Sequence, residues 1–298
     1  MTKYAYYPGC TLYTKARNLD LCARKAAEKV GFELVEMPSW NCCGAIYNAA
    51  SDDLAAQVGP VRNLAKASQL GDRDTGDSPH AGTVPLVTLC AACHNVLKRV
   101  ADRLSQPGNE VERDRLIAFV DEKFEHPVRV LHYLEVLKNE IGWDKVKERV
   151  SKPLTGLKVA SYYGCLMVRP REVLEFDDPE NPQVMDDLMR VLGAKPTKFD
   201  FKAECCGGYL VVNRRDVAKS ASKKILDNAK AWGAEAIVTT CPLCQYNLDK
   251  LRAMTDGSIP VFYFTQLLGV AVGLGQDELG LEHNAGDPVA VLKSKGLL

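Results

Sequence analysis

The sequence predicts an α/β protein built from two pseudo-symmetric halves, each a small, mostly parallel sheet flanked by helices. Short apolar segments alternate with segments of helical periodicity in both halves, and this order favours parallel sheets. An adjacent cysteine pair followed by glycine (the letters CCG) also occurs twice, at residues 42–44 and 205–207. We therefore expect two domains, residues 1–150 and 151–298, each with a site at the carboxyl ends of its strands.

The first half contains the strands and helices that such a domain requires. An aromatic strand ends in a Pro-Gly turn, and apolar residues then recur at helical spacing until Gly31 stops the helix. In order, the expected elements are strand 3–8, helix 16–30, strand 32–37, helix 54–70, a polar loop 71–83, strand 84–89, helix 93–100, a charged helix near 110–123, strand 127–130 and helix 131–137.

The second half restarts the same plan after a linker at residues 151–157, where Pro153 and Gly156 interrupt regular structure. Residues 86–97 and 237–248 align with their C-x-x-C motifs in register. This internal repeat is the basis for the two-domain prediction. The expected elements are strand 158–163, helix 184–192, helix 216–232, strand 236–240 and the segment 260–268, which repeats the pattern of residues 127–137.

The overall charge argues against a nucleic-acid partner. The 298 residues include 38 Lys and Arg and 38 Asp and Glu, so the chain has no net charge to attract nucleic acid or an anionic membrane. The longest apolar stretch, residues 261–275, is shorter than the about 20 residues of a membrane span, so we expect a buried or surface helix and no transmembrane segment. Because the N-terminus runs into a strand without a signal sequence, we expect a cytoplasmic protein.

Eleven cysteines in such a chain indicate metal ligands or redox groups, because disulfides need an oxidising compartment. Ten of them form two sets of five, each with a lone cysteine, an adjacent pair and a C-x-x-C motif. The remaining one, Cys22, lies on the apolar face of a helix, which favours a buried structural thiol. The candidate metal ligands are Cys10, Cys42, Cys43, Cys90 and Cys93 in the first half and Cys165, Cys205, Cys206, Cys241 and Cys244 in the second.

The adjacent cysteines can serve one site only if the backbone turns sharply, because neighbouring side chains in a strand point to opposite faces. Gly44 follows the first pair, and Gly207 and Gly208 follow the second. Glycine adopts left-handed conformations without a steric penalty. We therefore expect these three glycines to shape the cofactor-binding turns.

Four kinds of site could use these cysteines. A structural zinc ion takes four ligands and would leave one cysteine of each set unused, and a thiol–disulfide centre would use only the C-x-x-C motif. Covalent haem fits Cys90-Ala-Ala-Cys93-His94, but Gln245 replaces the histidine in the second half. An iron–sulfur cluster in each half is the interpretation that the pattern favours.

The spacing of the cysteines is C-x31-CC-x46-C-x-x-C in the first half and C-x39-CC-x34-C-x-x-C in the second. This pattern resembles the CCG, or cysteine-rich, domain, and the whole chain is similar to the B-type subunit of heterodisulfide reductase. Further matches are the Tyr-Tyr-Pro-Gly-Cys10 opening, Arg169-Pro170 and Cys241-Pro-Leu-Cys244. The gap between Cys43 and Cys90 is longer than in that family, and a surface loop at residues 71–83 can absorb the excess without moving the ligands.

This resemblance implies two noncubane [4Fe-4S] clusters, one held by each set of five cysteines. It also implies that Cys42, Cys43, Cys205 and Cys206 act as catalytic cluster ligands facing a shared cavity, where a disulfide or carrier-bound sulfur substrate undergoes redox chemistry. The implied partners are a ferredoxin-like, C-type subunit with [4Fe-4S] clusters and a flavin-containing, A-type subunit. Through such partners the chain could lie at the inner face of the membrane.

A second function follows from the same resemblance. Related chains are the E-type subunit of succinate or fumarate:quinone oxidoreductases, which passes electrons to quinone at the membrane surface. This alternative predicts an amphipathic surface segment, for which residues 261–275 are the sole candidate. Because residues 127–137 repeat this segment inside the first half, a core role is the interpretation that the repeat favours.

Overall fold

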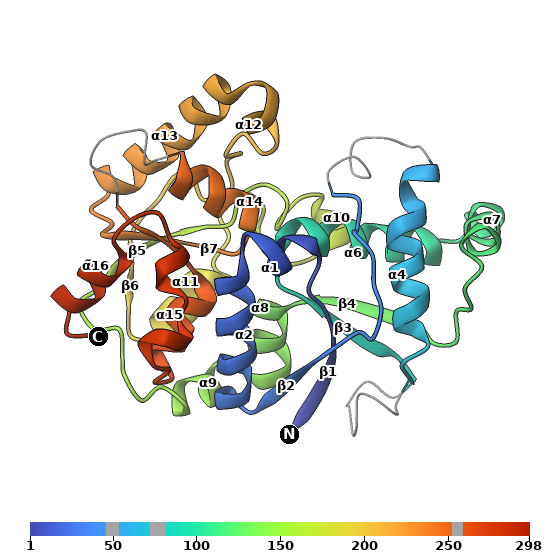
Figure 1. The fold of residues 1–298 in the computed structure, drawn as a ribbon, viewed down its shortest axis with the longest axis horizontal. Coiled ribbons are helices and arrows are strands. Elements are labelled where there is room, and N and C mark those ends of the chain that lie inside the picture. Colours follow the sequence, from blue (N-terminus) through green and yellow to red (C-terminus); the bar gives the residue numbers. More distant parts are fainter. Residues whose placement is uncertain (46–53, 72–81, 252–258) are drawn as a thin grey trace.

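In the computed structural model, the chain folds into two parallel sheets with helices packed around both (Figure 1). The structure describes residues 1–45, 54–71, 82–251 and 259–298, so most of the predicted loop 71–83 lies outside the described residues. The strands of the first sheet fall within residues 2–132 and those of the second within residues 158–263. The predicted α/β class is confirmed.

The first sheet has the strand order β2-β1-β3-β4, and all of its strand pairs are parallel. The central strand β1 pairs Tyr6 with Glu36 on one side and with Val87 on the other. Because β1 and β3 are neighbours that run the same way, the residues that follow them reach the same edge of the sheet. The strands are β1 (Thr2–Tyr7), β2 (Phe32–Glu36), β3 (Val84–Thr88) and β4 (Val128–His132).

The second sheet repeats this topology with the order β6-β5-β7-β8, again all parallel. Tyr162 at the end of β5 pairs with Thr239, as Tyr7 at the end of β1 pairs with Thr88. The internal repeat in the sequence is therefore a repeat of structure. The strands are β5 (Lys158–Tyr162), β6 (Lys195–Pro196), β7 (Ala236–Thr239) and β8 (Val261–Tyr263).

The long helices agree with the predicted segments within a few residues. The clearest case is the helix of the first half that ends at Gly31, whose φ of 113° is left-handed. The helices of the first half are α1 (Cys10–Thr14), α2 (Arg17–Val30), η1 (Leu54–Gln57), α4 (Val58–Ser68), α6 (Ala91–Ser105), α7 (Glu110–Val120), α8 (Tyr133–Glu135), η2 (Val136–Ile141) and α9 (Trp143–Glu148).

The second half adds several short helices that the sequence pattern did not predict. They include α12, which begins four residues after Cys206, and a π-helical turn after the second C-x-x-C motif. The helices are α10 (Arg171–Leu174), α11 (Val184–Val191), α12 (Leu210–Asn213), α13 (Arg215–Ala231), α14 (Pro242–Gln245), η3 (Tyr246–Lys250), α15 (Phe264–Ala271), η5 (Gln276–Glu278), η6 (Leu281–His283) and α16 (Pro288–Ser294).

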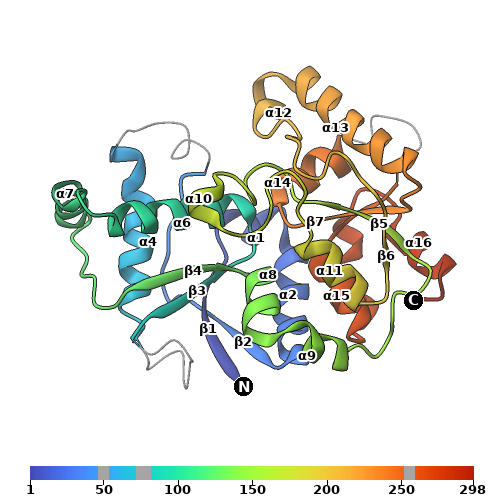
Figure 2. The ribbon, with the colours of Figure 1, turned by 180° about the vertical axis from the view of Figure 1, so that it is seen from behind.

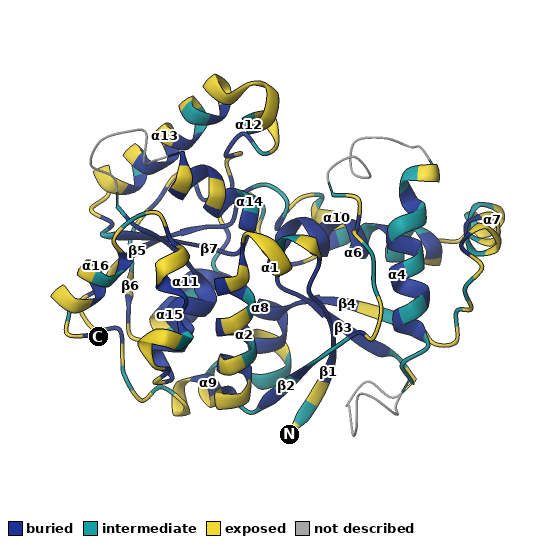
Figure 3. Cartoon of the chain, viewed as in Figure 1, coloured by how far each residue is buried: buried dark blue, intermediate teal, exposed yellow. Residues whose placement is uncertain are grey.

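The core runs through both sheets and the helices between them, where Figure 3 shows buried residues on the strands and on the inner helix faces. The α2 helix of the first half packs against α15 of the second. Cys22 on α2 is buried, as expected, and its thiol donates to the Leu279 carbonyl at 3.1 Å. The two halves are therefore joined by a continuous apolar interface.

The apolar stretch at residues 261–275 belongs to this core. It forms β8 and α15, and every residue from Val261 to Val272 is buried. The core role that its repeat of residues 127–137 favours is therefore confirmed. The amphipathic surface segment that the quinone alternative predicts is not found here, because the second half uses these residues as a sheet strand and an interface helix. Within the described residues, no helix combines the length and apolar character that a membrane span requires.

Candidate metal centres

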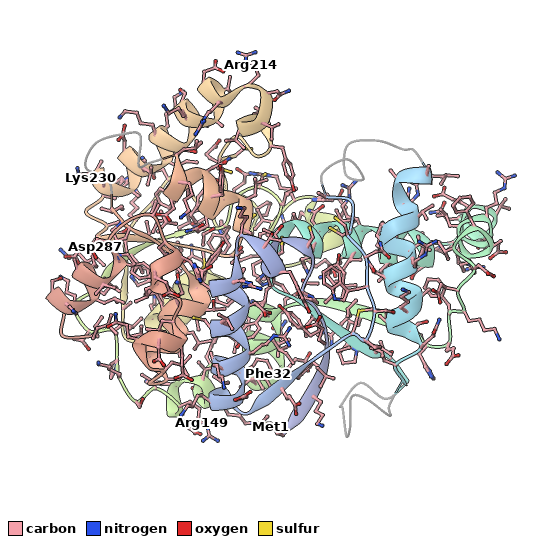
Figure 4. All side chains as sticks on the ribbon, viewed as in Figure 1. Met1, Phe32, Arg149, Arg214, Lys230 and Asp287 are labelled. Atoms are coloured by element: carbon pink, nitrogen blue, oxygen red, sulfur yellow. The ribbon has the colours of Figure 1, made fainter. Side chains whose placement is uncertain are left out.

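The helices that begin at cysteines gather in the middle of the molecule. Both views place α1, α6 and α14 close together between the two sheets (Figures 1 and 2). Cys10 is the first residue of α1, Cys90 caps α6 and Cys241 caps α14. In Figure 4 Met1, which precedes β1, and Arg214, which follows α12, lie at opposite ends of the molecule. The carboxyl ends of the strands thus deliver both cysteine sets towards the centre.

The first set brings its five cysteines together. The Sγ atoms of Cys10 and Cys42 lie 3.7 Å apart, and those of Cys43 and Cys93 lie 3.5 Å apart. Hydrogen bonding with the thiols of Cys42 and Cys93 lowers the pKa of Cys43 to about 3. Hydrogen bonding with Cys93 also lowers the pKa of Cys90. These contacts link all five thiols in one group, in which hydrogen bonding lowers the pKa of Cys43 and Cys90 and raises that of Cys42 and Cys93.

The second set has the same arrangement. The Sγ atoms of Cys206 and Cys244 lie 3.6 Å apart, matching the Cys43–Cys93 contact of the first half. Hydrogen bonding with Cys165 lowers the pKa of Cys205 to about 6, and hydrogen bonding with Cys244 lowers the pKa of Cys206. Cys241 completes the group through its contact with Cys244.

Each set has an exposed side and a buried side. Three thiols of each set are buried: Cys43, Cys90 and Cys93 in the first, and Cys206, Cys241 and Cys244 in the second. Cys10, Cys42 and Cys205 are exposed, and Cys165 is partly buried. The adjacent pairs thus place one thiol inside and one outside, as the sharp turn after each pair requires.

The glycines that follow the pairs have the expected left-handed backbone. The φ angles are 80° at Gly44, 91° at Gly207 and 50° at Gly208. A Cβ atom on Gly207 would lie 2.7 Å from Cα of Ala218, so the turn also packs tightly against α13. Their assignment as cofactor-binding residues stays a prediction.

Two glycines before the lone cysteines were not predicted from the sequence. A Cβ on Gly9 would lie 2.9 Å from Sγ of Cys93, and one on Gly164 would lie 2.9 Å from Sγ of Cys244. Both residues have positive φ. The signal was available, because glycine stands directly before the lone cysteine in both halves.

Two tyrosines, also not predicted, hold the segments that lead into the cysteine pairs. The hydroxyl of Tyr7 donates to the Asn41 carbonyl at 2.8 Å, and that of Tyr162 donates to the Glu204 carbonyl at 2.7 Å. Each accepting residue stands immediately before a cysteine pair. The strand ends β1 and β5 thus fix the backbone that presents the pairs.

The donor set fits an iron–sulfur cluster better than a single ion. Among the described residues, no three Cys, His, Asp or Glu side chains are arranged to hold one metal ion. The ten thiols instead form two groups of five, with glycine in place of a side chain against Cys93 and Cys244. A cluster takes thiolate ligands on several iron atoms, so it suits such a group.

A family model of the cysteine-rich domain, CCG, matches residues 4–98 and 159–249. The chain belongs to the CCG family. The two matched regions coincide with the two structural repeats, and the cysteines of both sets lie within them. The resemblance recognised from the cysteine spacing is thereby confirmed.

Curated relatives of this CCG chain match it over nearly its whole length. It is 32% identical to the 8-methylmenaquinol:fumarate reductase membrane anchor subunit of Wolinella succinogenes, covering 96% of this chain and 97% of that one. It is 28% identical to the B-type subunit of the ferredoxin/F(420)H(2)-dependent CoB-CoM heterodisulfide reductase of Methanosarcina acetivorans, covering 96% and 94%.

A solved structure of a hypothetical protein from Helicobacter pylori has a similar fold, with a TM-score of 0.69 at 13% identity. The match covers 95% of this chain and 51% of that one, so the CCG chain spans about half of the solved protein. At this identity the similarity concerns the fold alone.

The two cysteine sets of this CCG protein have neighbours in common. Burial and the nearby thiols of Cys90 and Cys241 raise the pKa of Tyr209, which precedes α12. Burial and the same two thiols raise the pKa of Tyr263, at the end of β8. Both phenols therefore lie near cysteines of both halves. Tyr209 is exposed and Tyr263 is buried, so they line the region between the sets at two depths.

Proposed function

We propose that this chain is the catalytic, B-type subunit of a heterodisulfide-reductase-like complex, with two noncubane [4Fe-4S] clusters acting on a disulfide or on carrier-bound sulfur. The observation that carries this proposal is the gathering of ten cysteines into two groups of five, with Cys10, Cys90 and Cys241 at helix starts that follow strand ends. Each group follows the equivalent strand ends of its own sheet. Tyr209 and Tyr263 each lie near cysteines of both groups. The proposed ligands are the ten cysteines named above, and the proposed domain division is 1–150 and 151–298.

In this proposal the clusters would supply electrons one at a time. The chain supplies the cysteine ligands and leaves one side of each group open to a substrate. Reduction of a disulfide takes up two electrons and two protons and yields two thiols. Cys42 and Cys205 stand on the exposed side of the two groups, where a substrate sulfur could approach. Cys43 and Cys206 are buried and hold the groups to the protein.

The electrons would come from or go to a ferredoxin-like, C-type subunit, which exchanges them with a flavin-containing, A-type subunit. The name of the Methanosarcina acetivorans relative, which describes part of a ferredoxin-dependent reductase, supports partners of this kind. We propose a cytoplasmic complex that can lie at the inner face of the membrane through these partners.

Metal analysis tests the proposal. Protein purified without oxygen should contain iron and sulfide and should give an EPR signal that Cys42→Ser and Cys205→Ser each reduce. Cys22→Ser is the matched control, because Cys22 is buried away from both groups, and it should leave the iron content unchanged. Zinc in place of iron would refute the proposal.

A second function is favoured by the Wolinella succinogenes relative, whose name describes the membrane anchor subunit of a fumarate reductase. By this alternative the chain is an E-type subunit that passes electrons to quinone. Residues 261–272 are buried and offer no membrane contact, so any such contact must use another surface. Flotation of the purified chain with liposomes discriminates, since the first function predicts that the chain stays unbound.

A further inference from the structure

Asn247 contributes a polar group to the second cysteine set from outside the cysteine motif. It lies in the π-helical turn η3, two residues beyond Gln245, and its side chain is fully buried. Its Nδ2 lies 2.9 Å from the Gly208 carbonyl oxygen, 3.2 Å from that of Cys206 and 3.5 Å from Sγ of Cys206. Such π-helical turns are frequent at functional sites.

The surroundings fix which end of the amide faces the cysteine. Two carbonyl oxygens lie against this end, and only the NH2 group can donate to them. The Gly208 carbonyl takes one hydrogen atom. The second lies between the carbonyl and the sulfur of Cys206, and the carbonyl already accepts from Oγ of Ser222 at 3.3 Å. The Cys206 sulfur therefore shares the second N–H with the Cys206 carbonyl.

We propose that Asn247 donates an N–H···S hydrogen bond to the Cys206 thiolate and raises the reduction potential of the cluster bound by the second cysteine set. This inference rests on the proposed function, because it requires that cluster. A reduced cluster carries additional negative charge, part of it on the ligand sulfurs, and a hydrogen-bond donor stabilises that charge. Burial strengthens the bond, since water does not compete for the sulfur. Asn247 is a positioning residue and touches no substrate in this proposal.

The first half supplies a matched control. When the C-x-x-C motifs are aligned, Val96 stands at the position of Asn247. The segment before the first pair is instead held by Asn63 of α4, whose Oδ1 accepts from the Asn41 amide at 2.9 Å and whose Nδ2 donates to the Asn41 carbonyl at 2.8 Å. Asn63 thus binds the backbone before the first cysteine pair, whereas Asn247 also contacts the sulfur of Cys206.

The test is a potentiometric titration of the whole, cluster-loaded chain, followed by EPR and visible absorption. Asn247→Val copies the residue of the first half and should make reduction of one cluster about tenfold less favourable, which is ~59 mV for a one-electron couple. The other cluster should be unaffected. The cluster that shifts should be the one that Cys205→Ser alters. Asn63→Val should lower stability while leaving the potential of the cluster bound by the second set unchanged.

The outcomes separate this inference from the proposed function. Absence of iron from the unmodified protein would refute the function, whereas full iron content with unchanged potentials in Asn247→Val would refute this inference alone. If the variant fails to bind iron, the unmodified protein reconstituted in D2O provides the test. An N–H···S bond should shift its Fe–S stretching bands in resonance Raman spectra relative to H2O, and unchanged bands would overturn the inference.

Discussion

At the scale of single residues, Gly9 and Gly164 let the sulfurs of Cys93 and Cys244 approach the backbone. Gly164→Ala should lose most of the iron of one cluster, because its Cβ would lie 2.9 Å from Sγ of Cys244. The control is Gly233→Ala, where φ is also positive but no described atom lies within 4 Å of the added Cβ. Both variants incur the backbone strain of about 1–2 kcal/mol. Iron analysis distinguishes them, and equal iron loss would contradict the prediction.

The exposed cysteines of the two pairs should differ in reactivity when no metal is bound. Hydrogen bonding with Cys165 lowers the pKa of Cys205 to about 6, whereas hydrogen bonding with Cys43 and burial raise the pKa of Cys42. The thiolate is the reactive form. Iodoacetamide should therefore modify Cys205 first at pH 7, with a rate that rises from pH 5 to 7 and then levels off. Peptide mapping measures this, and faster labelling of Cys42 would contradict it.

The sequence predicted the cysteines themselves because their spacing repeats and few other roles fit adjacent thiols. It did not predict Asn63, Asn247 or Tyr7, which hold the turns around the pairs. These residues lie far from the pairs along the chain, and their side chains are common in many structural roles. Their function depends on which strand and helix ends meet in space, and no local pattern records that.

At the scale of elements, a buried ion pair fixes the segment before the second cysteine pair. Nζ of Lys202 bonds Asp186 of α11 and the Pro182 carbonyl, and the Lys202 carbonyl accepts from the amide of Tyr163 at 2.8 Å. Lys202→Met should lower the free energy of unfolding by about 3–5 kcal/mol, because it leaves a buried carboxylate without its cation.

Urea unfolding measures this effect, and a double variant sharpens it. Lys202→Met combined with Asp186→Leu should recover much of the loss, since no buried charge is left uncompensated. The exposed pair Lys223–Asp227 is the control, and Lys223→Met should change stability by less than about 1 kcal/mol. A loss at Lys202 no larger than at Lys223 would contradict the prediction.

Long helices and inner strands could be predicted because each has a clear period and a clear stop, as α2 does at Gly31. The short elements could not. The two-residue strand β6 and the short helix α12 carry too few residues for a period, and tertiary contacts define them. The helix expected at residues 131–137 begins only at Tyr133, because β4 continues to His132.

At the scale of the whole molecule, a buried asparagine joins the two halves. Nδ2 of Asn284 donates to the Val261 carbonyl at 2.7 Å, and its Oδ1 accepts from Gln266 at 2.9 Å and from Asn18 of α2 at 3.2 Å. Asn284→Ala should lower the free energy of unfolding by about 2–3 kcal/mol, because it leaves buried polar groups unsatisfied.

Chemical denaturation of the purified chain tests this prediction. Asn213→Ala, at an exposed position of α12, is the control and should change stability by less than about 0.5 kcal/mol. The duplication was visible in the sequence, but the packing of α2 on α15 was not. Each helix has apolar residues at helical spacing, which predicts a buried face. The pattern does not indicate which other helix packs against that face.

The division of each cysteine set into an exposed and a buried side also bears on how the protein matures. Three buried thiols are already held in place by the core, while Cys10 and Cys42, and likewise Cys205, are open to solvent. For the proposed clusters, iron and sulfide could therefore enter from the solvent side while both sheets stay folded. The protein without metal would then hold its ligands in a preformed arrangement, and a protein that delivers iron would need to reach only the exposed thiols.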